Sequence, residues 1–344
     1  MRVITVMACR EALELFLTNL LLVSLLAGLN ISLRFLREDI GISELGMILG
    51  PILVSSLQFS FPLAAIISTT QLSNRWREEG TLQTVASGGL PSRTLFQPVI
   101  HLFAALALVF APFVHDLIPR TRLSLLEEGN RLIRSLLLSR ARTGVPLVLN
   151  THDRLFSQGV EGEELRDLTF TRTGPGQATV LKAARGRIID KEHTFQLECQ
   201  QVSIDSLEGD RTRRVDMDST TIPLETREKK LRDIDRESVI PSWKLGSQPA
   251  ERVEWHMRFS MFALLPLLAW LGLLIGPLLP FNNRAGSFVA ALLPIAVLYY
   301  PLLTLIQPSV IKGSLQTTSL WVPVAALYLL GLSLGSLLRR RGLG

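Results

Sequence analysis

The residue types that carry most protein chemistry are scattered in this sequence of 344 residues. None of the histidines has the spacing of a metal-ligand set; they are His101, His115, His152, His193 and His256. No G-x-S-x-G nucleophile pattern accompanies His152, which favours a surface turn there. No glycine precedes any lysine, so the phosphate-binding pattern G-x-x-x-x-G-K-[ST] is absent. The sequence therefore offers no acid–base or metal constellation and no route to ATP hydrolysis through that pattern.

Arg34 and Arg37 lie at the end of the first long apolar stretch. Guanidinium groups bind phosphate oxygens through paired, charge-assisted hydrogen bonds, so a phosphate group is one expected ligand. The acidic residues Glu38, Asp39 and Glu44 lie close by in the sequence and leave a second interpretation. In that interpretation the charges neutralise one another, and the arginines only anchor the end of a helix.

The uneven distribution of charged residues along the chain predicts the helices and the insert that position these residues. Hydrophobic residues make up 47% of the chain and charged residues 19%, below the roughly 25% charged that is usual for soluble domains. Residues 118–255 hold 23 of the 36 basic and 22 of the 30 acidic residues. Six other stretches are apolar over the roughly 20 residues that a membrane-spanning helix needs: 15–33, 46–72, 95–115, 259–280, 286–306 and 319–338. The sequence predicts a membrane protein with a polar insert between its third and fourth helices.

The short loops predict the orientation, because arginine and lysine accumulate in cytoplasmic loops. One set of loops and ends holds nine arginines: Arg2, Arg10, Arg75, Arg77, Arg93, Arg284, Arg339, Arg340 and Arg341. The other set holds three basic residues: Arg34, Arg37 and Lys312. We therefore expect a multi-pass protein with both termini in the cytoplasm and the insert outside.

Within the insert the hydrophobic period changes. Residues 120–142 have helix-like spacing, whereas residues 145–224 alternate between apolar and polar and predict an antiparallel β-domain. After Cys199 the alternation slips by one residue to Val202, which predicts a β-bulge. Residues 225–238 have charges spaced for a solvated helix.

Two features of the apolar stretches bear on mechanism. Helices 2 to 6 contain no Asp or Glu within the stretches given above, which disfavours coupling to a proton gradient. Small residues recur four apart at Gly46/Gly50, Gly272/Gly276 and Gly331/Gly335. Such pairs are either ordinary membrane glycines or close-packing seams with a partner subunit.

Three local matches, in the same order along the chain, resemble the LptF/LptG permease family. Ala86-Ser87-Gly88 follows the acidic Glu79 after the second apolar stretch. Residues 165–170 and 183–188 resemble the strand pattern of the family, and residues 254–259 resemble its transition into the fourth helix. The layout of the family is also similar: six transmembrane helices (3+3) with an inserted periplasmic antiparallel β-domain of jellyroll-like type. The resemblance covers nearly the whole chain.

This resemblance implies a permease subunit of the ABC transporter that extracts lipopolysaccharide from the bacterial inner membrane and passes it to a periplasmic bridge. The implied partners are a sister LptF/LptG-type permease, two LptB-type ATPases and an LptC-type bridge protein. No cofactor is expected in this chain, since ATP and Mg would bind the partner ATPase. Arg34 and Arg37 would bind lipid phosphates. The residues expected to couple the ATPase to the membrane helices are Glu79, Ala86, Ser87 and Gly88.

The expected domains are residues 1–117, with helices 1–3 and a cytoplasmic coupling loop at 73–94; residues 118–255, the periplasmic domain with flanking helices; and residues 256–344, with helices 4–6. Two other classes of function stay open. One is an ABC subunit that transmits mechanical motion and moves no lipid, and the other is a membrane-anchored assembly protein without an ATPase. An enzyme is the class that the sequence supports least.

Overall fold

The computed structural model describes residues 2–36, 42–125, 127–128, 138, 146–148, 152–174, 177–191, 194–208, 211–224, 236–278 and 284–340. The chain divides into two compact units. We call residues 1–123 together with 236–344 the helical unit, and residues 124–235 the β-unit. Each unit is described by itself.

Among the described residues, six helical segments are long and apolar enough to cross a membrane: Val3–Asn30, Leu49–Glu78, Arg93–Leu125, Pro249–Leu278, Ala285–Ile311 and Thr317–Arg340. Three precede the β-unit in the chain and three follow it. The fold class predicted from the sequence is therefore confirmed as a helical membrane protein with an inserted antiparallel β-domain.

The elements of this unit are α1 Arg2–Leu36, α2 Ile42–Glu78, α3 Thr81–Ser87, α4 Arg93–Pro112, η1 Phe113–Leu117, η3 Arg236–Val239, η4 Ser242–Lys244, α6 Pro249–Leu278, α7 Arg284–Leu293, η5 Pro294–Tyr299, α8 Tyr300–Ile311, η6 Thr317–Trp321 and α9 Val322–Arg340. Among them, η1 and η5 are π-helical turns within longer helices, whereas η3, η4 and η6 are 3₁₀ turns. A π-helical turn is wider than an α-helical one and often marks a functional position.

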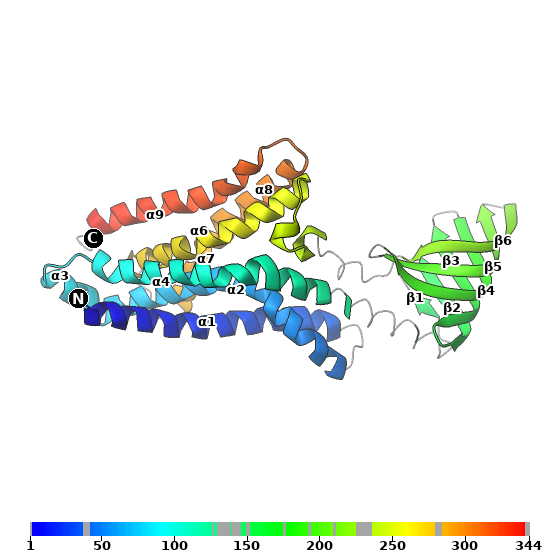
Figure 1. The fold of residues 1–344 in the computed structure, drawn as a ribbon, viewed down its shortest axis with the longest axis horizontal. Coiled ribbons are helices and arrows are strands. Elements are labelled where there is room, and N and C mark those ends of the chain that lie inside the picture. The colour runs from blue at the N-terminus through cyan, green and yellow to red at the C-terminus, as the bar shows by residue number, and fades with distance from the viewer. Residues whose placement is uncertain are drawn as a thin grey trace. The chain divides into compact units, whose positions relative to one another are not determined.

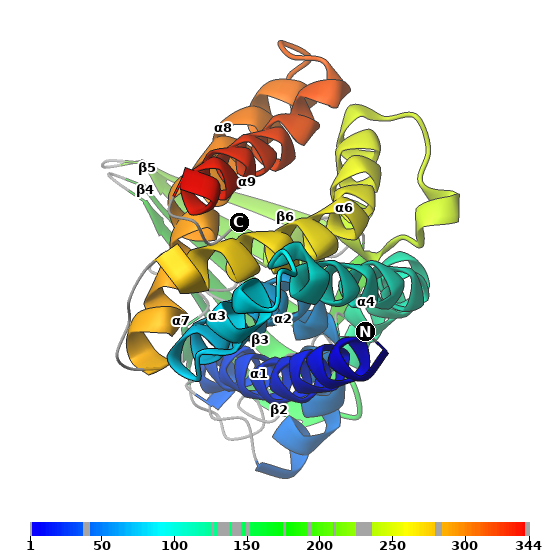
Figure 2. The same ribbon diagram turned by 90° about the vertical axis from the view of Figure 1, so that its left-hand side faces the viewer.

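The spans α2 and α6 form the centre of the helical unit. Two thirds of the most apolar window of each is buried, against 28% for α1 and for the span that contains α9. Helix α2 packs against both α1 and α6, and Figure 2 shows part of α2 between these two helices. The core between α1, α2 and α4 is rich in aromatic rings, where Phe16 meets Phe61 and Phe103 edge to face.

The β-unit contains one antiparallel sheet of six strands: β1 Leu147–Val148, β2 Asp153–Glu161, β3 Glu164–Gly174, β4 Gln177–Lys191, β5 Thr194–Glu208 and β6 Arg211–Leu224. The strands pair in chain order (Figure 1). This connectivity of the described strands is an antiparallel meander. The expected antiparallel domain is confirmed.

Along one row of residues across the sheet, the alternation of buried and exposed side chains shifts by one position on β3 and β5. On β5 the buried positions pass from Cys199 to Val202, and Gln201 between them has a φ of 55°. On β3 they pass from Leu165 to Leu168 around Asp167, which has a φ of 45°. The pairing register stays constant on both sides of this row. The predicted phase slip is confirmed, but the predicted bulge is wrong because neighbouring strands turn together and no extra residue is inserted.

Two other predictions fall largely on residues outside those described. The helix-like stretch 120–142 has few described residues beyond Leu125, namely 127, 128 and 138. Of the helix predicted over 225–238, only residues 236–238 are described. They belong to η3, a 3₁₀ turn, so the helix is not supported there.

Candidate functional site

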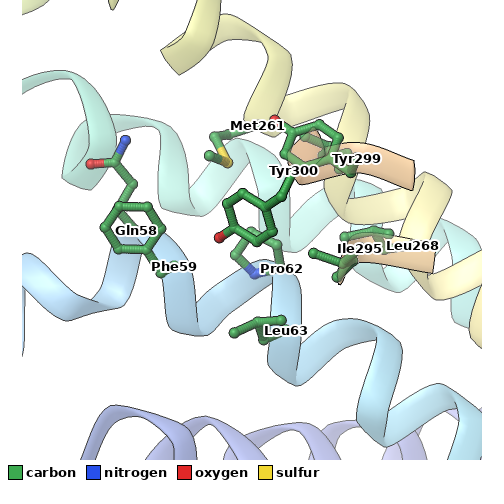
Figure 3. Close-up of a pocket in the computed structure, with 10 residues that line it drawn as sticks. Gln58, Phe59, Pro62, Leu63, Met261, Leu268, Ile295, Tyr299 and Tyr300 are labelled. Atoms are coloured by element: carbon green, nitrogen blue, oxygen red, sulfur yellow. The ribbon is translucent and has the colours of Figure 1, made fainter. Parts of the chain in front are cut away.

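The helical unit contains an apolar cleft between three spans. Its lining comes from α2 (Gln58, Phe59, Pro62, Leu63), from α6 (Met261, Leu264, Leu268) and from η5 and α8 (Ile295, Tyr299, Tyr300). Figure 3 shows the Tyr300 ring over Pro62, with its hydroxyl oxygen pointing toward α2. The cleft has an empty volume of about 300 Å³, including space that opens outward.

The sequence explains why the helices do not close here. Pro62 lies inside α2 and has no N–H to donate to the carbonyl of Gln58, one turn earlier. On the opposite wall Pro294 begins the π-helical turn η5, which carries Tyr299. The rim of the cleft is polar, because Nη2 of Arg122 donates to Oε1 of Gln58 at 2.7 Å. The arrangement therefore combines an apolar lining with one polar group at the rim.

Helices α2 and α6 approach so closely behind the cleft that only glycine fits. A Cβ on Gly272 would lie 2.1 Å from Oγ1 of Thr69 and 2.7 Å from the carbonyl oxygen of Ile66. A Cβ on Gly276 would lie 2.1 Å from Oγ of Ser73, and that hydroxyl donates to the carbonyl oxygen of Gly272 at 3.1 Å. A close-packing seam therefore exists at Gly272/Gly276, but it lies within this chain and not, as was expected from the sequence, against a partner subunit.

The other predicted small-residue pairs lack such a seam among the described residues. A Cβ added to Gly46, Gly50 or Gly335 would meet nothing within 4 Å. A Cβ on Gly331 would contact the ring of Trp270, a side chain of α6 rather than its backbone.

A buried arginine ties together the chain segments that flank the inserted unit. Arg258 of α6 is 1% exposed, and its Nε forms an ion pair of 2.8 Å with Oε1 of Glu254. Its two terminal nitrogens donate to three backbone carbonyl oxygens at 2.8–3.1 Å, those of Glu237, Ser238 and Ile240. These carbonyls belong to η3 and the residue that follows it. Arg258 therefore fixes the returning chain against α6.

The same arginine is connected to the end of the third span. Nη1 of Arg258 donates to Oγ of Ser242 at 3.0 Å, and the same hydroxyl lies 2.7 Å from Nδ1 of His115 in η1. The His115 ring stacks on Phe262 of α6, with ring centres 5.2 Å apart. We call Arg258, Glu254, Ser242, His115 and the three carbonyl groups the clasp. It joins α6, the returning segment and η1 within the helical unit.

The predicted coupling residues lie together on the surface at the other end of the spans. Glu79 follows the end of α2, and Nε of Arg75 donates to its Oε1 at 2.6 Å. Ala86 and Ser87 end the short helix α3, and Gly88 follows it. All four predicted residues are exposed, so the structure brings them to one surface.

Helix α3 packs through its buried side chains against the core of the helical unit. Leu82 and Val85 are buried in the same apolar cluster as Trp76. The Trp76 indole donates to Oε2 of Glu11 in α1 at 3.0 Å. Gly80 begins α3 with a φ of 71°, a left-handed conformation that favours glycine. The exposed face of α3 therefore belongs to a helix whose buried side chains pack in the same core as those of α1 and α2.

The predicted phosphate-binding pair lies outside the described side chains. Arg34 belongs to the last turn of α1, but its side chain is not among those described, and Arg37 lies outside the described residues. In the part of the chain that the structure describes, no group of three or more His, Cys, Asp or Glu side chains is placed to hold a metal ion.

The β-unit buries its apolar face in its own core. Leu155, Leu165 and Leu197 are fully buried in one cluster. Cys199 belongs to this cluster, and burial raises the pKa of its thiol from 9.0 to about 12. Outside this core, the pKa of Arg187 is raised by its hydrogen bond to Glu163. The described apolar side chains of the sheet are therefore buried in a core of the β-unit itself.

Sequence reasoning missed the clasp and the cleft. The only signal for the clasp was the i,i+4 spacing of Glu254 and Arg258 at the start of an apolar stretch. The cleft had a weaker signal, since Pro62 and Pro294 mark interruptions in two apolar stretches without showing that they face each other.

Comparison with known proteins gives a match to a family model. No curated protein matches the chain. The family model described as "Lipopolysaccharide export system permease LptF/LptG" matches residues 8–340, which include all six membrane-spanning helices except a few terminal residues, and the whole insert. The chain belongs to the LptF/LptG family of lipopolysaccharide export permeases.

Proposed function

We propose that this chain is the permease subunit of an ABC transporter that extracts lipopolysaccharide from the inner membrane and passes it to a periplasmic bridge. The observation that carries this proposal is the family match over residues 8–340. A separate ATPase supplies the energy in this proposal, with ATP and Mg bound in that partner and no cofactor in this chain.

The distribution of arginines supports an orientation for the chain. Arg75 and Arg77 end α2, Arg93 begins α4, and Arg339 and Arg340 end α9. We refer to this side of the helical unit as the basic end. The positive-inside rule places it in the cytoplasm. An insert between the third and fourth spans then lies in the periplasm, and both termini are cytoplasmic.

Helix α3 is the proposed contact for the LptB-type ATPases. Its exposed residues Ala86 and Ser87, with Gly88 and Glu79, lie at the basic end, while Leu82 anchors the helix in the core. A force applied to the exposed face is transmitted to α1 and α2, because their side chains share that core.

Solvent physics supports an apolar path for the lipid. Each methylene group moved into water costs about 0.8 kcal/mol, so a chain of about twelve carbons costs on the order of 10 kcal/mol. The cleft lined by Met261, Tyr299 and Tyr300 gives such a chain an apolar surface beside the polar group of Gln58. Arg34 and Arg37 remain proposed ligands of the lipid phosphates.

The other partners fit two further surfaces. The apolar window of α1 is only 28% buried and offers a face to a sister permease. Strand β6 pairs along one edge, with β5, in the described sheet. A free edge accepts another strand, which suits handover to an LptC-type bridge. Residues 118–255 form the periplasmic domain in this proposal.

Purification from mild detergent followed by mass spectrometry tests the proposal. We expect a second LptF/LptG-type permease, an ATPase and lipopolysaccharide in the purified complex. An ATPase without bound lipid would support a mechanotransmitting subunit, and the absence of any ATPase would support an assembly protein.

A variant pair tests the ATPase contact itself. We expect Ala86→Arg on the exposed end of α3 to abolish lipid-stimulated ATP hydrolysis. The matched control is Ser314→Arg, which adds the same charge to an exposed loop between α8 and η6. Unchanged coupling in Ala86→Arg would contradict the assignment of α3.

A further inference from the structure

A short turn on the returning chain presents a tryptophan to the surroundings. In η4, Ser242 is buried, whereas Trp243 is 60% exposed and Lys244 is also exposed. An indole of this exposure is unusual on a surface that faces only water, because tryptophan contributes a large apolar area.

The apolar stretches 95–115 and 259–280 within the longer helices place this turn at a membrane boundary. An α-helix rises 1.5 Å per residue, so Phe259 lies about 28 Å from the end of α6 at Leu278, by the same rise. Helix α9 begins after Trp321 and reaches the basic end with a comparable length. His115 is likewise about 33 Å from Arg93. Each distance is close to the roughly 30 Å thickness of the hydrocarbon core.

Aromatic side chains mark the same level of the helical unit. Trp255 is 38% exposed and stacks on Phe259, which is also 38% exposed, with ring centres 4.1 Å apart. The Trp321 indole donates to Nδ1 of His256 at 3.2 Å. Tryptophan is enriched where the hydrocarbon core meets the headgroups, because its ring is apolar and its N–H is polar.

The clasp brings η4 to this level. Ser242 is hydrogen-bonded to both His115 and Arg258, and these two residues lie where the apolar stretches 95–115 and 259–280 meet the polar part of the chain, opposite the basic end. Trp243 is the next residue in the chain. The position of Trp243 along the membrane normal is therefore set by the hydrogen bonds of Ser242 to two spanning helices rather than by a free loop.

We propose that η4 is a membrane-interface anchor, with the Trp243 indole inserted among lipid headgroups and the Lys244 ammonium beside lipid phosphates. Arg258 is the positioning residue, since it holds the turn without contacting the lipid. The occupant of this surface is the bilayer interface at the ends of the spans opposite the basic end. The proposal does not rest on lipid export, because it requires only that the helical unit spans a membrane.

Tryptophan fluorescence of the full chain in phosphatidylcholine–phosphatidylglycerol nanodiscs tests the anchor. Nitroxide groups are attached to the lipid chains either near the headgroup or near the methyl end, and iodide is the aqueous quencher. The contribution of Trp243 is the difference between the unmodified chain and Trp243→Phe. The matched control is Trp270→Phe, since Trp270 lies in the middle of α6 and contacts Tyr328.

We expect the Trp243 contribution to be quenched roughly twofold more by the shallow nitroxide than by the deep one, as for interfacial indoles. Quenching by iodide without quenching by the shallow nitroxide would overturn the proposal, because Trp243 would then face water. Quenching by neither would also overturn it, because another part of a protein would then cover the indole.

A second measurement avoids loss of the indole signal. A nitroxide at Trp243→Cys, in a Cys9→Ser background, is compared with one at the exposed Ser247→Cys. We expect contact with oxygen to exceed contact with a water-soluble nickel chelate at position 243 and not at position 247. Arg258→Lys should reduce this difference at position 243 while the thermal midpoint of the chain stays above the assay temperature. Equal accessibility at both positions would contradict the anchor.

Discussion

The glycine seam between α2 and α6 gives the sharpest prediction about the membrane core. Gly272→Ala places a methyl group 2.1 Å from Oγ1 of Thr69, 2.7 Å from the carbonyl oxygen of Ile66 and 2.9 Å from the backbone nitrogen of Thr70. Thr69 can rotate only by giving up its 2.7 Å hydrogen bond to the carbonyl of Ala65. The other two atoms are backbone, so the helices must separate.

The magnitude follows from three terms. Overpacking a close contact costs about 1–3 kcal/mol. Separating the helices also weakens the hydrogen bond from Ser73 to the carbonyl of Gly272, which is worth about 1 kcal/mol. Alanine returns about 1 kcal/mol through its better helix propensity. We expect a net loss of about 1–3 kcal/mol for Gly272→Ala, combining these figures.

Thermal unfolding in one detergent, followed by loss of helical circular dichroism, measures the effect. The matched control is Gly335→Ala in α9, because no atom lies within 4 Å of the added methyl group. We expect the midpoint of Gly272→Ala to fall by several degrees and that of Gly335→Ala to stay or rise. Equal midpoints for the two variants would refute the close approach of α2 and α6.

Three further predictions concern other buried groups. Arg258→Met leaves Glu254 without its ion-pair partner and should destabilise the helical unit by about 3–5 kcal/mol; an unchanged thermal midpoint would contradict the clasp. Cys199 should react with maleimide at neutral pH only after denaturation. Burial raises the pKa of its thiol from 9.0 to about 12, so the free energy of unfolding should fall as pH rises from about 9 toward 12. Cys199→Ser should lessen this fall. The same alkaline slope in both proteins would contradict the burial of the thiol. Asp153→Asn should lower the stability of the β-unit, measured by limited proteolysis, since both carboxylate oxygens accept bonds of 2.8 Å from Arg172.

The six spans and the antiparallel insert could be predicted because each depends on a local pattern. A long apolar run has few alternatives to a spanning helix, since its backbone must satisfy its own hydrogen bonds in lipid. Alternation of polar and apolar residues likewise predicts strands with one buried face. The exposed position of Ala86, Ser87 and Gly88 agrees with the predicted surface role of that turn, although the role itself remains a proposal.

The remaining features depend on contacts between distant segments. Nothing in the spacing of Gly272/Gly276 distinguishes it from Gly46/Gly50, yet only the first pair faces a neighbouring helix in the described residues. The clasp depends on backbone carbonyls, which carry no sequence signal. The bulge prediction was wrong because alternation within one strand does not show that Asp167 and Gln201 turn in the same row of the sheet.

The central claim is that this chain moves lipopolysaccharide only when a separate ATPase drives it. Its most direct test is lipid release from proteoliposomes that contain the chain with its co-purified partners. We expect release to require ATP, to stop in Ala86→Arg and to be absent for the isolated chain. ATP hydrolysis by the complete complex without any release of lipid to a periplasmic acceptor would contradict the claim.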